Sequence, residues 1–354
     1  MTAPFKKITI IGLGLIGSSV ARAVRVHSLA DIIVGVDNNE VSLGFARKHG
    51  FIDEASTDAA DAVKGSDIVL IATPPHLLAD ICQLIAPELK EGTLVMDTGS
   101  VKQIPLALMK EMLPPHALIV PAHPIAGSEQ SGVAAGRADL LEKKRVIITP
   151  EAPLTHVQLQ QVNLFWHTLG ARVEAMPADM HDTIYGYVSH LPQFLAFAVS
   201  PLVNASNEDI AGNETLRRFL RISHSDRALW NSIFLLNRDV LYAATTRYFD
   251  VIAHIRRELA SAPQEAPSET GSIARLTLFP RIVASCLVTT VMEAEKKTGV
   301  PFVRFAGTGF SDFTAPATTD PEGDMEHISS HYAQLGEMLE IFMSRLLELR
   351  ATLE

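Results

Sequence analysis

The feature that most constrains the fold is the stretch GLGLIG at residues 12–17, because it joins an unbroken apolar run to a helical pattern. Residues 7–13 read KITIIGL, as a buried parallel strand does, and residues 15–27 have helical periodicity. A strand, a glycine turn and a helix in this order predict the start of a dinucleotide-binding sheet. In that arrangement Gly12 permits the tight turn, Gly14 lets the backbone approach a pyrophosphate, and Gly17 allows close helix–strand contact. We expect the N–H groups that open the helix, at Leu15 and Ile16, to hold the phosphates.

An acidic residue stands where such a site needs one. Asp37 ends the second apolar run, 20 residues after Gly17. Its carboxylate would accept hydrogen bonds from the ribose hydroxyls and repel a 2′-phosphate, and Asn38 and Asn39 follow it instead of an arginine. The sequence therefore predicts NAD rather than NADP. A glycine turn of purely structural use would leave Asp37 unexplained.

The rest of the first half continues the alternation of strands and helices. Short apolar runs without polar alternation are typical of parallel strands covered on both faces. We therefore predict a Rossmann-like doubly wound parallel sheet over residues 1–176, with KRVIITP and ARVEAMP as later strands that extend it. The predicted strands are 7–13, 31–37, 67–73, 92–98, 117–123, 144–150 and 171–177, and the helices between them are 15–27, 40–49, 76–86, 101–112 and 155–169.

After about residue 177 the strand signals stop, and an all-α region is expected. Residues 261–271, SAPQEAPSETG, form a linker that divides it into 177–260 and 272–354. The two parts resemble each other: SHLPQFLAFAV at 189–199 aligns with TLFPRIVASCLV at 277–288, and FLRISHSD at 219–226 aligns with FTAPATTD at 313–320. Two motifs in the same order and at similar spacing favour a duplication over coincidence. The predicted helices are 178–205, 225–260, 272–298 and 322–353.

Composition excludes several classes of protein. A net charge of -10 without a basic run argues against nucleic-acid binding. Two isolated cysteines are too few for a disulfide framework or a zinc site, which indicates a reducing cytoplasm and no bound metal. Glycines interrupt the apolar N-terminal stretch, and no run approaches the ~20 apolar residues of a membrane span.

Three loops at the carboxyl ends of predicted strands carry candidate site residues. In ATPPH, Thr73 and Pro74 are expected to line the wall beside the cofactor. In DTGSVK, Ser100 either caps the following helix or lies beside the nicotinamide. In AHPIAGSEQSG, His123 is a candidate acid–base group. Removal of hydride from an alcohol carbon requires an acceptor for the hydroxyl proton, and a neutral imidazole can serve.

These motifs together resemble a known family. GLGLIGSS, DTGSVK, AHPIAGSEQSG, SHLP and RISHSDRALW occur in the order and spacing of the prephenate/arogenate (cyclohexadienyl) dehydrogenases of tyrosine biosynthesis, over most of residues 6–260. The resemblance implies NAD-dependent oxidative decarboxylation of a cyclohexadienyl dicarboxylate. It implies that His123 hydrogen-bonds the ring hydroxyl, that Ser100 lies beside it and that Arg221 binds a substrate carboxylate. Ser128 and Glu129 belong to the same substrate loop, where Glu129 matches an acid proposed to gate the site.

The substrate remains open between prephenate and arogenate. The family's usual S-H-x-P-H has a second histidine that contributes to substrate binding, whereas SHLPQ has Gln193 there. His190 is either a substrate contact or a packing group. Two other functions fit less well. A β-hydroxyacid dehydrogenase of the 6-phosphogluconate type needs a lysine that residues 178–205 lack, and a non-catalytic NAD-binding sensor would not need Ser100, His123 and Arg221 together.

The second helical copy has lost site residues. Ala315 and Asp324 stand where Arg221 and Trp230 stand in the first copy, although FAGTGFSDFT at 305–314 resembles a family motif. Family members have one set of these helices and dimerise through them. The resemblance thus implies a homodimer, or else a single-chain pseudo-dimer in which the second copy replaces the partner subunit's helices.

Overall fold

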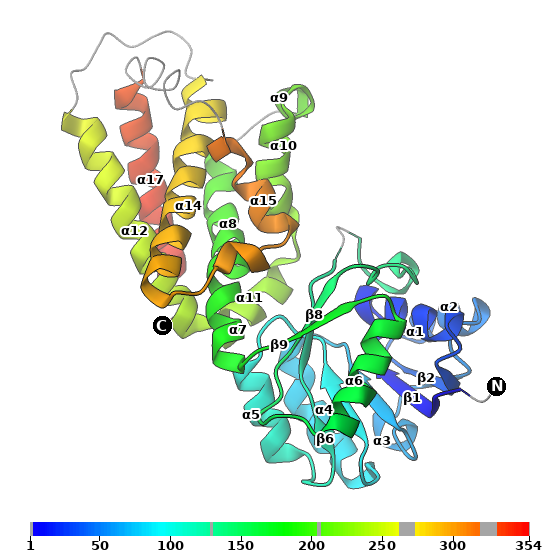
Figure 1. Cartoon of the computed structure of the whole chain (residues 1–354). Coiled ribbons are helices and arrows are strands. Elements are labelled where there is room, and N and C mark those ends of the chain that lie inside the picture. Colours follow the sequence, from blue (N-terminus) through cyan, green and yellow to red (C-terminus); the bar gives the residue numbers. More distant parts are fainter. Residues whose placement is uncertain (1–2, 128–129, 204–206, 262–272, 319–330, 354) are drawn as a thin grey trace. The chain divides into compact units, whose positions relative to one another are not determined.

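The computed structural model describes residues 3–127, 130–203, 207–261, 273–318 and 331–353. The chain divides into two compact units, Met1–Asp182 and Thr183–Glu354. The first contains all the strands of the described residues, and the second is helical (Figure 1).

A six-stranded parallel sheet forms the centre of the first unit, in the order β3-β2-β1-β4-β5-β6. This order is that of a dinucleotide-binding sheet, so the doubly wound fold is confirmed. The short edge strand β3 was not predicted, since its EAS sequence lacks an apolar run. The strands are β1 (Phe5–Ile11), β2 (Ala30–Val36), β3 (Glu54–Ser56), β4 (Ile68–Ile71), β5 (Leu94–Asp97) and β6 (Leu118–Ile119).

The central strands contribute alternate residues to two cores, which is why their runs are apolar throughout. Ile68 and Leu70 of β4 belong to one core, whereas Val69 and Ile71 belong to the other. Helices α1, α2 and α6 cover the first face, and α3, α4 and α5 cover the second. Their bounds are α1 (Leu15–Val26), α2 (Glu40–Lys48), α3 (Ala59–Ala62), α4 (Leu78–Ile85), α5 (Gln103–Met112) and α6 (His156–Thr168).

The prediction for the end of this unit was wrong in two respects. Residues 117–123 do not form one strand: β6 ends at Ile119, and β7 (Ala122–Pro124) begins in a different sheet. The predicted strands 144–150 and 171–177 join β7 there as β8 (Arg145–Ile148) and β9 (Arg172–Ala175) and do not extend the large sheet. An apolar run shows that a strand is buried, but it does not show which sheet the strand joins.

Among the described residues of the helical unit, two segments are π-helical, η4 (Gly186–His190) and η6 (Ala274–Leu278), and a long helix directly follows each. The predicted helix 178–205 is α7, η4 and α8 in series, and 225–260 is two helices, α11 and α12. The linker 261–271 and the start of the last predicted helix fall mainly outside the described residues. The helices are α7 (Ala178–Tyr185), α8 (Leu191–Val203), α9 (Asn207–Gly212), α10 (Glu214–Arg221), α11 (Arg227–Leu236), α12 (Arg238–Ser261), α14 (Phe279–Thr298), α15 (Thr308–Phe313) and α17 (Tyr332–Ala351).

One segment, Ala274–Thr298, is long and apolar enough by composition to cross a membrane. However, 56% of its apolar window is buried inside the protein, because α14 packs against α12 and α17. This burial is typical of a core helix in a globular domain.

Candidate active site

The glycine turn after β1 is shaped by two glycines and left open at a third. Gly12 has a φ of +93°, and a Cβ there would lie 2.7 Å from the carbonyl oxygen of Ala72. A Cβ on Gly17 would lie 1.9 Å from the carbonyl oxygen of Gly12. At Gly14, by contrast, no atom lies within 4 Å of the position that a Cβ would take. The fold thus requires Gly12 and Gly17, while Gly14 leaves a space that an approaching pyrophosphate can use.

The N-terminus of α1 faces this turn. Its N-cap residue is Gly14, which has no side chain to cap the helix. The N–H groups of Leu15, Ile16 and Gly17 have no acceptor inside the helix, since an α-helix leaves its first donors unpaired. These groups fit a phosphate. The loop after β4 adjoins the turn: the Thr73 Cγ2 would lie 2.9 Å from a Cβ on Gly12, and Pro74 follows it.

Asp37 lies directly after β2 and is tied to the glycine turn. One carboxylate oxygen accepts the Leu13 N–H at 2.8 Å, and the other accepts the Asn39 N–H at 2.9 Å. Each carboxylate oxygen can accept a second hydrogen bond. The carboxylate is therefore held in place with acceptor capacity for ribose hydroxyls.

A buried ion pair links β5 to β7. The Lys102 Nζ lies 2.6 and 2.7 Å from the two Asp97 carboxylate oxygens and donates to the Ala122 carbonyl at 2.7 Å. Burial lowers the pKa of Lys102, and the negative charge of Asp97 opposes that change. Because Ala122 precedes His123, this lysine holds the backbone of His123 close to the end of β5.

His123 belongs to a chain of buried side chains. Its Nδ1 lies 2.8 Å from the His181 Nε2, and the His181 Nδ1 lies 2.8 Å from the Asp182 Oδ1. His181 is fully buried and His123 is 8% exposed. A carboxylate accepts hydrogen bonds only, so we assign the His181 proton to Nδ1 and the His123 proton to its own Nδ1. In this assignment the Nε2 of His123 carries the lone pair and can act as a base.

Asp182 also fixes the helix that follows Ser100. Its two carboxylate oxygens accept the Lys102 N–H at 2.7 Å and the Gln103 N–H at 2.8 Å, at the N-terminus of α5. Ser100 is partly exposed in the loop between β5 and α5. The capping that the sequence offered as one explanation of Ser100 is therefore performed by Asp182. The other two loop candidates, Ser128 and Glu129, lie outside the described residues.

In the helical unit, Arg221 is the last residue of α10 and pairs with the second copy. Its Nε donates to the Asp312 Oδ2 at 2.6 Å, and the Arg218 Nε donates to the Asp312 Oδ1 at 2.9 Å. The Asp312 side chain is 14% exposed, compared with 31% for Arg221. One carboxylate from α15 thus orients two arginines of α10.

Gln193 and His190 are both buried in the helical unit. The Gln193 Nε2 donates to the Ile222 carbonyl at 2.7 Å, and the Ser225 Oγ donates to the Gln193 Oε1 at 3.4 Å. The Asn237 Nδ2 lies 2.9 Å from the His190 Nδ1. Gln193 therefore fixes the turn directly after Arg221.

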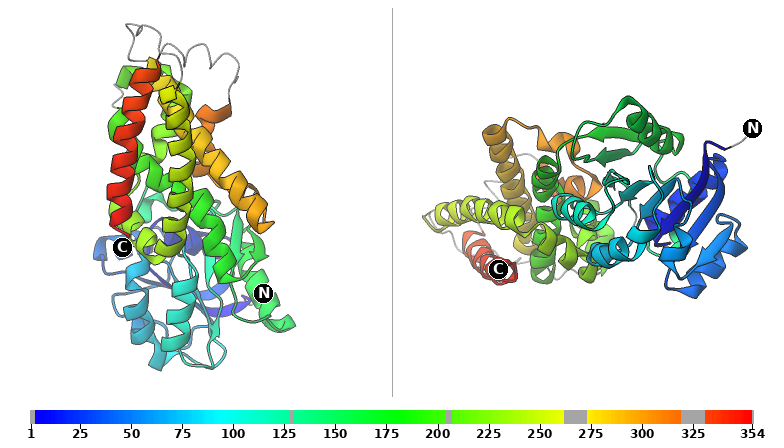
Figure 2. Two further views of the ribbon diagram at one scale, coloured as in Figure 1. Left: turned by 90° about the vertical axis from the view of Figure 1, so that its left-hand side faces the viewer. Right: turned by 90° about the horizontal axis from the view of Figure 1, so that it is seen from below.

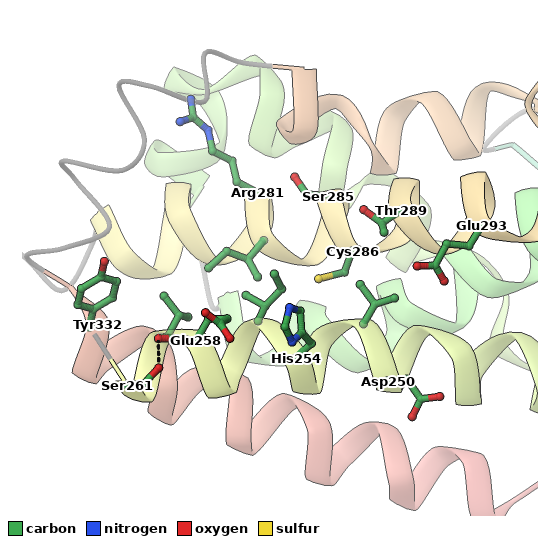
Figure 3. Close-up of a pocket in the computed structure, with 14 residues that line it drawn as sticks. Asp250, His254, Glu258, Ser261, Arg281, Ser285, Cys286, Thr289, Glu293 and Tyr332 are labelled. Carbon is green, nitrogen blue, oxygen red and sulfur yellow. Dashed lines mark hydrogen bonds between the residues drawn. The ribbon is translucent and has the colours of Figure 1, made fainter. Parts of the chain in front are cut away.

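A cavity of about 900 Å³ lies between α12 and α14, and none of the predicted site residues lines it (Figure 3). His254 and Cys286 extend into the space between the two helices, with Asp250, Glu258 and Glu293 nearby. Within the described part of the chain, no cluster of three or more His, Cys, Asp or Glu side chains could hold a metal ion. The predicted site residues are therefore identified by their hydrogen bonds and ion pairs, because this cavity lies elsewhere in the chain.

Two family profiles match the chain: the nucleotide-binding domain of prephenate dehydrogenase over residues 20–175, and the dimerization domain of prephenate dehydrogenase over residues 177–270. The cyclohexadienyl dehydrogenase of Zymomonas mobilis is 34% identical over 266 residues, which cover 73% of this chain and 89% of the relative. The chain belongs to the prephenate dehydrogenase family. It is accordingly an NAD-dependent dehydrogenase, as the motifs implied.

Further relatives agree with this assignment. The prephenate dehydrogenase of Bacillus subtilis is 30% identical, over 70% of this chain and 69% of the relative. A solved prephenate dehydrogenase from A. aeolicus, in complex with hydroxyphenyl propionate and NAD⁺, is 30% identical with a TM-score of 0.65 and covers 82% of this chain and 96% of its own. This dehydrogenase thus shares both fold and sequence with structurally characterised members of the family.

Sequence reasoning about this dehydrogenase missed three residues that contact the candidates. His181 and Asp182 lie 58 and 59 positions after His123, inside a helical pattern, and Asp312 lies 91 positions after Arg221. The adjacent histidine and aspartate in DMHDTI were the available signal, because a buried His–Asp pair often orients another group. No comparable local signal distinguishes Asp312.

Proposed function

We propose that this enzyme converts prephenate and NAD⁺ to 4-hydroxyphenylpyruvate, CO₂ and NADH. The observation that carries the proposal is the chain Asp182–His181–His123, which presents a neutral imidazole as a base on the unit that contains the glycine turn. The residues at Gly14, Leu15 and Asp37 fit the phosphates and ribose of NAD, which supplies the hydride acceptor when it is bound.

The proton accounting of this reaction suits a buried histidine. As hydride leaves ring carbon C4, the C4 hydroxyl passes its proton to the Nε2 of His123 and a carbonyl forms. Loss of the ring carboxylate as CO₂ then aromatises the ring, and the resulting phenolate oxygen takes the same proton back. No proton is released overall, so the base needs to hold the proton only between the two steps. The hydrogen bond from the His123 Nδ1–H to His181 stabilises the imidazolium during that interval.

Arg221 is proposed to bind a substrate carboxylate. A dicarboxylate approaching a protein with a net charge of -10 needs a local cation. The planar guanidinium group matches a carboxylate with two parallel N–H donors. Asp312 engages the Arg221 Nε and thereby sets the plane of this group.

We propose prephenate as the substrate because both family profiles and the relatives from Bacillus subtilis and A. aeolicus are named for prephenate dehydrogenase; arogenate is the alternative. Gln193 replaces the family's second histidine, but its amide nitrogen is used by the Ile222 carbonyl. We therefore propose that Gln193 shapes the turn beside Arg221 and does not choose between keto-acid and amino-acid side chains.

We also propose a cytoplasmic location, which suits two buried cysteines with free thiols. Of the two assemblies expected from the sequence, we favour the single-chain pseudo-dimer.

The test is NADH formation with prephenate and with arogenate in parallel, from about pH 5.5 to about pH 9. Activity with prephenate is expected, and replacement of His123 by Asn should lower kcat by about 10²–10⁴ while NAD affinity is retained. Activity with arogenate alone would transfer the assignment to the alternative. Full activity of the His123→Asn variant would remove the base from the mechanism.

A further inference from the structure

The helical unit is built twice: equivalent elements lie 88 positions apart at its start and 94 positions apart further along. The π-helices η4 and η6 begin at Gly186 and Ala274, 88 positions apart, and α8 and α14 follow each of them directly. Further along, α10 and α15 begin at Glu214 and Thr308, 94 positions apart. The same offset of 94 separates Arg238 and Tyr332, where α12 and α17 begin. A π-helix is rare, so its recurrence directly before the first long helix of each copy indicates a true repeat.

The buried positions repeat as well. The four buried residues of α17 each lie 94 positions after a buried residue of α12. The two helices therefore turn the same face inward. The matching positions are Leu241, Thr245, Tyr248 and Ile252 in α12, and Leu335, Leu339, Phe342 and Leu346 in α17.

The contacts between the two copies occur in pairs, as a two-fold axis relating the copies would require. If residue i of one copy contacts the equivalent of residue j in the other copy, such an axis requires that residue j of the first copy contacts the equivalent of residue i in the second. Arg256 donates to Glu340 at 2.9 Å, and Arg350 donates to Thr246 at 3.1 Å. With the offset of 94, each of these pairs is the image of the other. At the level of helices, α12 contacts α14 as α17 contacts α8, and Figure 2 shows α12 and α17 side by side.

Residues on such an axis should meet their own counterparts, and three do. Phe219 stacks on Phe313 with ring centroids 4.6 Å apart. Tyr248 meets Phe342 edge-on at 6.3 Å. The third pair is Arg218 with Asp312, joined by a hydrogen bond of 2.9 Å. Two identical chains would place like charges at that position, whereas two copies in one chain can carry opposite charges.

We propose that the second helical copy is a built-in partner: it fills the place of a second subunit and holds Arg221 through Asp312. The family profile named for dimerization matches residues 177–270 and ends before this copy begins. Ala315 occupies the position equivalent to Arg221, so the second copy brings the aspartate without a second arginine. Asp312 is thus a positioning residue, a role that rests on the proposed function of Arg221.

The assembly is tested by the molar mass of the whole protein, which does not depend on any activity. Light scattering should give 38.5 kDa, the mass of one chain. A mass of twice this value would overturn the proposal that the partner is built in.

The positioning role is tested by comparing Asp312→Asn with the matched variant Arg218→Gln, after parent activity with prephenate has been established. Both changes break the Arg218–Asp312 pair, but Asp312→Asn alone removes the charge that holds Arg221. We expect Asp312→Asn to raise the KM for prephenate at least about fivefold, with the KM for NAD unchanged. Arg218→Gln should stay within about twofold of the parent KM, because the Arg218 side chain is 43% exposed and its ion pair is screened by solvent.

The thermal midpoints separate this role from a structural one. If both variants lose similar stability and Asp312→Asn alone changes the KM, then Asp312 positions Arg221. Equal KM values in the two variants would refute that role. A parent enzyme without activity towards prephenate would instead refute the proposed function and leave the mass measurement standing.

Discussion

The His181 Nε2 lies 2.8 Å from the His123 Nδ1, in a part of the protein closed to solvent. This contact determines which nitrogen of His123 carries the proton, because Asp182 engages the far side of His181. In the proposed mechanism, the proton position on the base is therefore set by His181, a fully buried side chain.

Replacing His181 by Phe should lower kcat about 10- to 100-fold, less than loss of His123 itself, because the base remains but its proton position is no longer fixed. His181→Gln should recover part of the rate, since its amide oxygen can accept the His123 Nδ1–H. The measurement is kcat together with NAD affinity, which neither change should alter. The exposed His167→Asn variant is the control. Parent kcat in the Phe variant would contradict the assignment.

Two alanine substitutions in the glycine turn should have opposite consequences. Gly14→Ala places a methyl group in empty space, so the thermal midpoint should change little, but the NAD Kd should rise at least about tenfold, or about 1.4 kcal/mol. Gly17→Ala places its methyl group against the Gly12 carbonyl. This change should destabilise the first unit whether or not NAD is bound. Calorimetric titration with NAD and thermal unfolding separate the two effects. A Gly14→Ala protein that binds NAD as the parent does would show that the pyrophosphate lies elsewhere.

Protonation of Asp67 at acid pH should lower the stability of the protein, because this carboxylate accepts hydrogen bonds from the first residues of β1. Burial raises the pKa of this carboxyl, but hydrogen bonds from Lys90 and from the Lys6 and Lys7 N–H groups outweigh it, and the net pKa is lowered. A lowered pKa stabilises the fold above the unfolded value of about 3.9, and this stabilisation is lost as the pH falls through the folded pKa.

Asp67→Asn should therefore cost about 1 kcal/mol at neutral pH and progressively less below about pH 4. Denaturant unfolding of parent and variant at several pH values measures the difference. Asp239→Asn removes the same charge at a 97% exposed position and should have little effect at any pH. A cost for Asp67→Asn that stays constant down to pH values well below about 4 would refute the linkage.

The two cysteines offer one reporter in each unit. Burial raises the pKa of Cys82 and of Cys286 to about 12, so both thiols should resist alkylation at neutral pH. Cys286 borders the cavity between α12 and α14, whereas Cys82 packs in the sheet core. We expect iodoacetamide to modify Cys286 faster than Cys82, with both far slower than in denaturant, as followed by mass spectrometry of the peptides. Equal alkylation rates would indicate that unfolding of the whole protein exposes both thiols.

The sequence predicted what depends on neighbouring residues. The glycine turn GLGLIG and the apolar runs of β1, β2, β4 and β5 identified the sheet, since each of these patterns is local, and Asp37 follows at a fixed spacing of 20 residues after Gly17. The change of sheet at Pro121 was not predictable, because the run from Ala117 to His123 is apolar on both sides of it.

The contacts between residues far apart in the sequence could not be predicted either. His181 meets His123 from 58 positions further along the chain, and no periodicity encodes that contact. Aligning the two helical copies places Arg218 opposite Asp312, yet alignment searches for similarity, and these two residues carry opposite charges.

The pairing of α12 with α17 within one polypeptide has a thermodynamic consequence. Two helices joined by the chain meet at an effective concentration that the connecting segment sets, whatever the amount of protein in solution. Dilution dissociates an association between separate subunits, but it leaves this pairing intact. The helical half should therefore keep the same folded fraction in a dilute assay as in a concentrated stock.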